Sequence, residues 1–387
     1  MRILCLTPWY PAFSGDKEGS FIQDSLEALA DLGHDVDVIV TRPWRPERPP
    51  LLKSALPCSA GRAKVRLIRH LSIPRNYLRW ISDWLYRWAV SARLAEHART
   101  MAAEAILVHT ELPAIAAVPV ARRLGIPVLV TLHGINTDLR LNTPARITVL
   151  RQALSMADRV ILVGKPLHEH FASIVSCSEH FRIVPNGFRP PQTVPEWRTR
   201  WGAERRFVSV SNLHEGKGIE FTLKALERLK AQGCEQWQYT VVGGGQLREK
   251  LERLSAELGI GPQVSFVGPV SPEKVHEHLG KADVFVLPSY REAFGIAYLE
   301  AMSNGLLTIG ISGQGPSDFI EHGVTGILVA PQDVNDLVEK LKNCFTRPDE
   351  MQAIARQGQD RAFAEFTWAS HAHKLSEVIL ETVNKLQ

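Results

Sequence analysis

The stretch FIQDSLEALADLGHDVDVIV, residues 21–40, decides the fold class of this chain. Its apolar residues first recur at helical spacing over 21–32, Gly33 then provides a helix-ending residue, and 36–40 is a short apolar run. A second apolar run, 3–6, precedes this stretch. Strand, helix and strand in that order predict one βαβ unit of a parallel sheet.

The same alternation of apolar runs and helix-period segments continues along the chain. Further strands are predicted in two groups, at 105–108, 128–132 and 159–163, and at 207–211, 239–242, 264–267, 284–287 and 307–309. This pattern is typical of α/β proteins with doubly wound, Rossmann-like domains. Ligands of such domains bind at the carboxyl ends of the strands.

A proline-rich stretch separates the two groups. PNGFRPPQTVPEW, residues 185–197, contains four prolines within its first eleven residues, which disfavours both a helix and a central strand. We therefore predict a first domain over 1–190 and a second over 191–366.

Composition and charge narrow the class of protein. The 387 residues are 45% hydrophobic and 22% charged, which is typical of a globular chain of more than one domain. No run approaches the roughly 18 apolar residues of a membrane span, and the N-terminal residues turn polar too early for a secretory signal, so we expect a cytoplasmic protein. The five cysteines lie far apart, which predicts neither a zinc site nor a disulfide framework. Residues 1–200 carry 26 Lys and Arg against 17 Asp and Glu, and the remainder 19 against 24, so the halves favour different partners.

The segment VLPSYREAFGIAYLEAMSNG, residues 286–305, carries the most chemical information. A predicted strand ends there, Glu292 follows in a loop, and a helix is expected from about Gly295. Backbone amides at this helix start, near Phe294 and Ile296, have no helical partners and favour an anion. A carboxylate beside an anion site needs hydroxyls or cations to bind, so the segment fits a phosphorylated sugar better than bare phosphate.

This segment resembles the signature of retaining GT-B glycosyltransferases of the family 4 type, in which two Glu residues are separated by seven others. The resemblance implies that Glu292 lies beside the donor sugar and that Glu300 binds the ribose hydroxyls. It further implies a GT-B fold and transfer of a sugar from a nucleoside-diphosphate sugar to a glycan or lipid-linked saccharide, as in bacterial surface or exopolysaccharide synthesis. No metal or other cofactor is expected. The second domain would hold the donor and the first the acceptor, with a C-terminal helix over 367–387 packing back on the first.

Two glycine-containing segments extend the resemblance on the donor side. SVSNLHEGKGIE, residues 209–220, is similar to the family's strand-loop-helix segment, which implies that Lys217 grips the donor pyrophosphate. Where the family usually has an Arg, this chain has Asn212, which keeps a hydrogen-bond donor but lacks the charge. The negative charge of the diphosphate would then be balanced by Lys217, the helix amides and Arg291. VVGGG at 241–245 places Gly243 among the expected donor-binding residues.

The first domain contains the matching acceptor-side segments. VTLHGIN, residues 130–136, resembles the strand end from which the family's His reaches the sugar, here His133. YPAFSGDKEGSF, residues 10–21, resembles the loop that faces donor and acceptor, although the family's Gly-Gly pair is replaced by the separated Gly15 and Gly19. With VPNG at 184–187 and SGQGPSDFIEHGVTGILV at 312–329, the resemblance covers essentially the whole chain.

Three other functions are compatible with parts of this pattern. A GT-B-shaped sugar-nucleotide epimerase would release a changed sugar nucleotide without an acceptor. A non-catalytic accessory subunit is favoured by Asn212 and disfavoured by the presence of Lys217, Glu292 and Glu300. A dinucleotide site at the three glycines from Gly243 is disfavoured because Arg248 stands where its fingerprint has a third glycine.

Residues 61–100 contain nine Lys and Arg against two acids, with aromatic side chains at helical intervals. One interpretation is an amphipathic helix on an anionic membrane, with peripheral attachment to its inner face. The other is a helix that packs its aromatic stripe on its own domain. No module for nucleic-acid binding accompanies the charge. The aromatic residues are Tyr77, Trp80, Trp84 and Trp88, and the basic residues expected near lipid headgroups are Arg75, Arg79 and Arg87.

Overall fold

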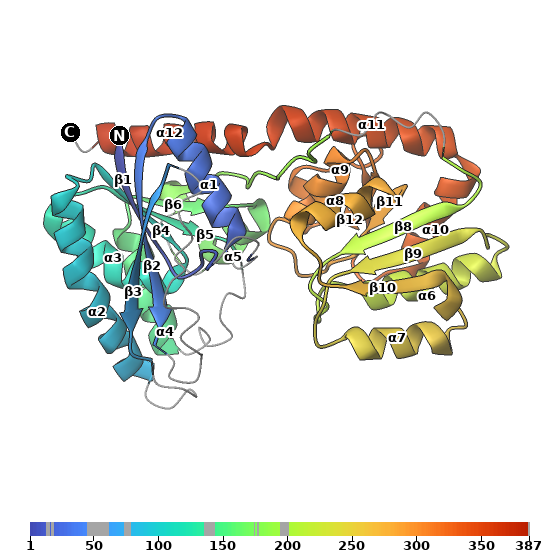
Figure 1. Ribbon diagram of the computed structural model, residues 1–387, viewed down its shortest axis with the longest axis horizontal. Coiled ribbons are helices and arrows are strands. Elements are labelled where there is room, and N and C mark those ends of the chain that lie inside the picture. Colours follow the sequence, from blue (N-terminus) through green and yellow to red (C-terminus); the bar gives the residue numbers. More distant parts are fainter. Residues whose placement is uncertain are drawn as a thin grey trace. The chain divides into compact units, whose positions relative to one another are not determined.

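The computed structural model describes residues 1–12, 16, 19–44, 62–72, 79–134, 144–173, 175, 178–193 and 201–385. The chain divides into two compact units (Figure 1). Unit 1 consists of Met1–Gly187 and Trp368–Gln387, and unit 2 is Phe188–Thr367. These divisions lie three residues and one residue from those that the sequence predicted, at 190 and 366.

In the described part of unit 1, a seven-stranded parallel sheet has the order β3-β2-β1-β4-β5-β6-β7. Its strands are β1 (Arg2–Thr7), β2 (Asp35–Pro43), β3 (Lys64–His70), β4 (Ala105–His109), β5 (Val128–Leu132), β6 (Arg159–Leu162) and β7 (Phe181–Ile183). Its helices are α1 (Ser20–Asp31), α2 (Arg79–Thr100), α3 (Glu111–Leu124), α4 (Pro144–Met156), α5 (Lys165–Ala172) and α12 (Trp368–Asn384), with a short 3-10 helix at Ser178–His180. The predicted βαβ unit is confirmed by the parallel pairing of β1 with β2 across α1.

Unit 2 contains a six-stranded parallel sheet of order β10-β9-β8-β11-β12-β13 among its described residues. The strands are β8 (Arg205–Val210), β9 (Trp237–Val242), β10 (Val264–Gly268), β11 (Val284–Val286), β12 (Leu307–Ile311) and β13 (Ile327–Val329). The helices are α6 (Ile219–Ala231), α7 (Arg248–Glu257), α8 (Pro272–Gly280), α9 (Ile296–Ser303), α10 (Val334–Thr346) and α11 (Pro348–Glu365), with 3-10 helices at Gly261–Gln263 and Gly315–Asp318. Two Rossmann-like α/β units confirm the predicted fold class.

Three strands were missed in the sequence, and all three have weak patterns. β3 reads KVRLIRH, in which charged and apolar residues alternate as on a partly exposed strand at the edge of the sheet. β7 and β13 are each three residues long and also lie at sheet edges. The central strands were predicted because helices cover both of their faces, which selects a continuous apolar run such as the fully buried β4.

The last helix, α12, belongs to unit 1 and packs on α1 (Figure 1). Nε2 of His371 lies 2.7 Å from Oγ of Ser25, and Nε2 of His34 lies 2.8 Å from Oγ of Ser376. Leu375 and Ile379 of α12 are buried in the same core as Ile22 and the neighbouring apolar residues of α1. The C-terminal helix is therefore part of the unit 1 core.

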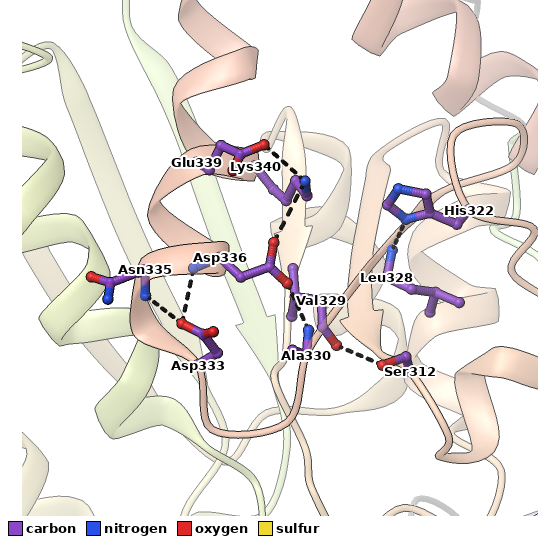
Figure 2. Close-up of polar contacts among 10 residues, drawn as sticks. All are labelled: Ser312, His322, Leu328, Val329, Ala330, Asp333, Asn335, Asp336, Glu339 and Lys340. Atoms are coloured by element: carbon purple, nitrogen blue, oxygen red, sulfur yellow. Dashed lines mark hydrogen bonds and ion pairs between the residues drawn. The ribbon is translucent and has the colours of Figure 1, made fainter.

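The β12–β13 edge of unit 2 is held by short polar contacts (Figure 2). The N–H of Ser312 donates to the carbonyl of Val329 at 2.9 Å. At the start of α10, Oδ1 of Asp333 accepts the backbone N–H groups of Asn335 at 2.9 Å and Asp336 at 3.0 Å (Figure 2). The Ser312 bond ties the end of β12 to β13, and the Asp333 carboxylate caps α10. From Ser312 the chain continues to Gln314.

Candidate functional site

Two oppositely charged side chains meet at the carboxyl edge of the unit 2 sheet. Lys217 lies in the loop after β8, and Glu292 lies in the loop after β11, the neighbouring strand. Nζ of Lys217 is 2.7 Å from Oε2 of Glu292, with side-chain exposures of 17% and 13%. The structure thus joins the two residues that the sequence predicted for the two ends of a sugar–diphosphate bond.

Close backbone contact holds these two loops together. Gly218 has φ +73°, and a Cβ there would lie 2.1 Å from the carbonyl oxygen of Pro288. The carbonyl of Gly216 accepts hydrogen bonds from the backbone N–H of Tyr290 at 2.9 Å and from Oγ of Ser289 at 3.1 Å. Lys217 is therefore fixed from both sides, and position 218 requires glycine.

A third loop, after β12, holds the backbone of Glu292. The N–H of Glu292 donates to Oε1 of Gln314 at 3.1 Å, and its carbonyl accepts the N–H of Gly315 at 2.9 Å. Gly315 is necessary for this approach, because a Cβ there would lie 2.4 Å from Cα of Phe294. Sequence reasoning missed Gln314, since nothing in a single sequence links it to a residue in another loop.

The loop that carries Glu292 leads into helix α9. Gly295 occupies the N-cap position with φ +97°, and a Cβ there would be 2.6 Å from Cδ2 of Tyr298. The first amides of α9, from Ile296, point beyond the helix start and are suited to an anion. The Phe294 side chain instead packs edge-on against Phe319 in the core, so only its backbone is available to a ligand.

Tyr298, on α9, is a buried residue beside the site that was not predicted from the sequence. Its hydroxyl donates to the carbonyl of Leu287 at 2.6 Å, and its side chain is fully buried. Burial, with a smaller effect of the Glu292 carboxylate, raises the pKa of Tyr298. It therefore remains a neutral hydrogen-bond donor that ties α9 to the end of the neighbouring strand.

The other residues predicted to bind the donor lie on three different segments of unit 2. Asn212 is exposed in the loop after β8. Gly243 follows β9 with φ +131°, and a Cβ there would lie 1.9 Å from the carbonyl of Ser211, so glycine permits the two strand ends to approach. Glu300 is half-buried on α9, where its carbonyl accepts Nδ2 of Asn304 at 2.7 Å.

Unit 1 has a polar cluster of its own at the carboxyl edge of its sheet. His133 follows β5, and its Nε2 lies 2.8 Å from Nδ1 of His109, the last residue of β4. The ring of Phe21, in α1, contacts the His133 ring edge-on at 4.9 Å.

Gly19 caps α1 with φ +78°, where a Cβ would lie 2.4 Å from the backbone of Trp9. Gly15 lies outside the described residues.

Burial keeps both histidines of this cluster neutral. It lowers the pKa of His109 to about 3, and it lowers the pKa of His133 well below its usual value. The neighbouring His109 further lowers the pKa of His133, and His371 lowers the pKa of both rings. His109 was not predicted. It directly follows the predicted strand 105–108, as His133 follows 128–132, so the sequence placed both histidines at strand ends.

The aromatic residues of α2 do not all pack on unit 1. Tyr86 is buried, with its ring edge-on to His70 at 4.8 Å. Trp84 and Trp88, one helical turn apart, are 61% and 72% exposed. The interpretation that the whole stripe packs on its own domain is therefore wrong for these two. The described residues exclude Arg75, Tyr77 and the side chains of Arg79 and Trp80, whereas Arg87 is exposed.

None of the described helices combines the length and apolarity that crossing a membrane requires. Among the described residues, no group of three or more His, Cys, Asp or Glu side chains is arranged to hold a metal ion.

Two family models match consecutive parts of the chain. The model described as "Glycosyltransferase Family 4" matches residues 19–190, and the model described as "Glycosyl transferases group 1" matches residues 195–361. Among curated relatives, a GDP-mannose-dependent α-(1-6)-phosphatidylinositol monomannoside mannosyltransferase of Mycolicibacterium smegmatis is 28% identical over 277 residues. That alignment covers 67% of this chain and 72% of the relative.

Solved structures share the fold over nearly the whole length. Sucrose-phosphate synthase from Thermosynechococcus elongatus superposes with a TM-score of 0.78 at 22% identity, covering 100% of both chains. Alr3699/HepE of Anabaena, determined in complex with UDP, has a TM-score of 0.75 at 18% identity and covers 98% of this chain and 100% of its own. At these identities the likeness concerns the fold.

Proposed function

The chain belongs to the GT-B glycosyltransferases of the family 4 type, and from this membership we propose that it transfers a sugar from a nucleoside-diphosphate sugar to a glycan or lipid-linked saccharide with retention of anomeric configuration. The observation that carries the proposal is the contact between Lys217 and Glu292. An ammonium for phosphate and a carboxylate for sugar hydroxyls lie side by side, next to the first amides of α9.

In the proposed reaction, Lys217 and the α9 amides stabilise the departing diphosphate while Glu292 orients the sugar. The bond between the anomeric carbon and the phosphate oxygen breaks through an oxocarbenium-like state. The acceptor hydroxyl forms the new bond from the same face, and its proton passes to the departing phosphate. His133 would contact the sugar from unit 1, and Glu300 would bind the ribose hydroxyls.

We assign the second positive charge at the diphosphate to Arg291. It is exposed next to Glu292, and a Cβ on Gly216 would lie 3.1 Å from its Cβ, so it flanks the Lys217 loop. Asn212 would contribute a neutral hydrogen bond, and Gly243 would allow close approach of the backbone. With these groups we propose that the reaction needs no divalent metal, so turnover should be unchanged in excess EDTA.

We place the acceptor on unit 1 and propose that α2 rests on the inner face of an anionic membrane. The exposed Trp84 and Trp88 and the exposed Arg87 lie on one side of α2, opposite the buried Tyr86. Exposed Trp next to Arg is typical of helices at a lipid interface. The mycobacterial relative is named for a phosphatidylinositol-linked substrate, which supports a lipid-linked acceptor for this chain as well.

The function is tested first by ligand-induced stabilisation. The thermal unfolding temperature is measured with UDP, GDP, ADP and CMP at equal millimolar concentration, because a ligand at one hundred times its Kd stabilises by about 2.7 kcal/mol. The nucleotide that stabilises the protein identifies the donor class. Sugar donors of that class are then incubated with and without saccharide acceptors.

The products separate the candidate functions. A glycosylated acceptor that keeps the donor's anomeric configuration supports the proposal. A changed sugar nucleotide formed without acceptor would indicate an epimerase. Absence of stabilisation by every nucleotide, with and without magnesium, would favour an accessory subunit instead.

A further inference from the structure

We propose that His109 is a positioning residue for His133. A direct hydrogen bond between the two imidazoles sets the tautomer and the ring orientation of His133. The inference rests on the proposed role of His133 at the donor sugar. His109 itself is 1% exposed and cannot contact a substrate, so it would act through its neighbour.

The sheet brings the two rings together. β4 and β5 are parallel neighbours, and His109 pairs with Thr131, which precedes His133 by two residues. Residues two apart project to the same face of a strand. Nδ1 of His109 therefore reaches Nε2 of His133 at 2.8 Å, and the two ring planes are nearly parallel, at 12° to each other with centroids 5.1 Å apart.

Two neutral imidazoles in this contact must have matching tautomers. If His109 carries its proton on Nδ1, it donates to Nε2 of His133, whose own proton must then be on Nδ1. If His133 carries its proton on Nε2, then Nδ1 of His109 accepts and the His109 proton is on Nε2. Mixed arrangements place two protons or two lone pairs against each other. His109 thus determines whether Nδ1 of His133 is a donor or an acceptor.

Two further observations support this assignment: the surroundings of the two ring nitrogens outside the contact, and the turn that follows His109. Nδ1 of His133 and Nε2 of His109 are buried, and neither has a hydrogen-bond partner among the described residues. The next residue, Thr110, has φ +73°, which is costly for a β-branched residue. Its N–H donates to the carbonyl of Thr131 at 2.8 Å, so the strained turn fixes the end of β4.

The tautomers are read first, by nitrogen-15 NMR of histidine-labelled, ligand-free protein at neutral pH. We expect His109 and His133 to share one tautomer, both Nδ1–H or both Nε2–H. In His109→Leu the His133 ring should change its tautomer distribution, whereas His109→Asn, whose amide occupies the place of Nδ1, should retain a single one. Opposite tautomers in the unaltered protein, or an unchanged His133 tautomer in a folded His109→Leu, would overturn the proposal.

Kinetics then test whether the coupling matters for the reaction. His109→Leu should lower kcat about tenfold, which corresponds to about 1.4 kcal/mol in the activation free energy. Nucleotide affinity should change little. His109→Asn should restore most of that loss. The matched control is His97→Asn, which removes another histidine of unit 1, hydrogen-bonded to Asp37 at 2.8 Å, and should leave kcat unchanged.

The two proposals fail differently. If the NMR results are as expected but neither His109→Leu nor His133→Ala lowers turnover, the assigned role of His133 is wrong and the coupling stands. If His133→Ala abolishes turnover while folded His109→Leu keeps it, the positioning role of His109 is overturned and the proposed function stands.

Discussion

Nζ of Lys217 lies 2.7 Å from Oε2 of Glu292, so the groups proposed to bind the phosphate and the sugar of one donor neutralise each other. A nucleoside diphosphate alone would attract Lys217 and leave the Glu292 carboxylate without its cation. A complete donor supplies hydroxyls to Glu292 at the same time. In the proposed mechanism the contact would therefore favour the intact donor over its nucleotide product, which must leave after transfer.

Removing the charge of Lys217 alone is expected to destabilise the protein more than removing the charges of both Lys217 and Glu292. Glu292→Ala should reduce turnover at least a hundredfold, about 2.7 kcal/mol, with the fold intact. Lys217→Met leaves a mostly buried carboxylate unpaired and should lower the unfolding free energy by about 1–3 kcal/mol. The double variant Lys217→Met/Glu292→Gln should recover that stability without recovering turnover, as measured by denaturant unfolding and donor consumption. Near-normal turnover in Glu292→Ala would exclude the sugar-binding assignment.

Glu300→Ala should weaken nucleotide binding about tenfold, or about 1.4 kcal/mol, because it removes the proposed partner of the ribose hydroxyls. Isothermal titration with the stabilising nucleotide measures this directly. The same nucleotide with a 2′,3′-dideoxyribose should bind the unaltered protein and the variant equally. An unchanged affinity for the normal nucleotide would contradict the ribose role.

Gly218→Ala should both destabilise unit 2 and impair turnover, because the new Cβ would lie 2.1 Å from the carbonyl of Pro288. The matched control is Gly233→Ala, at φ +88° with no atom within 4 Å of its Cβ, which carries the backbone strain without the clash. We expect the control to lose only about 1 kcal/mol of stability and no activity. Equal effects of the two substitutions would show that the loop contact is unimportant.

Gln314→Ala removes the acceptor of the Glu292 N–H and should lower kcat several-fold while leaving nucleotide affinity intact. Gln314→Glu retains an acceptor at that place but adds a charge near Glu292, so it should preserve stability better than kcat. Both are measured by steady-state kinetics alongside thermal unfolding. A kcat unaffected by either change would mean that Gly315 alone suffices to hold Glu292.

Trp84→Ser/Trp88→Ser should reduce sedimentation with vesicles that contain anionic phosphatidylglycerol. Both side chains are exposed, so the unfolding temperature should change little. Leu32→Ser in the same unit serves as a control for loss of an exposed apolar residue. Equal vesicle binding by the double variant and the unaltered protein would rule out α2 as the membrane contact.

The sequence predicted ten of the thirteen described strands, because a buried strand leaves a local apolar pattern. Lys217 and Glu292 were singled out by the resemblance to a family, and their proposed roles stay predictions. Buried parallel strands impose continuous apolar runs, and the loops after neighbouring strands must meet at one edge of the sheet. Gln314, Tyr298 and His109 were not predicted. Each acts through a contact with a residue from another loop or strand, and such pairings are set by the register of the sheet and not by spacing along the chain.

Because α12 completes the core of unit 1, the polypeptide encloses unit 2 as an insertion between two parts of one folding domain. During synthesis all of unit 2 leaves the ribosome before the last helix of unit 1 does. The apolar face of α1 then stays uncovered until α12 has been synthesised, and unit 2 is free to fold first. A stop before Trp368 would leave a folded unit 2 attached to an incomplete, aggregation-prone unit 1, so quality control of this chain depends on residues 368–387.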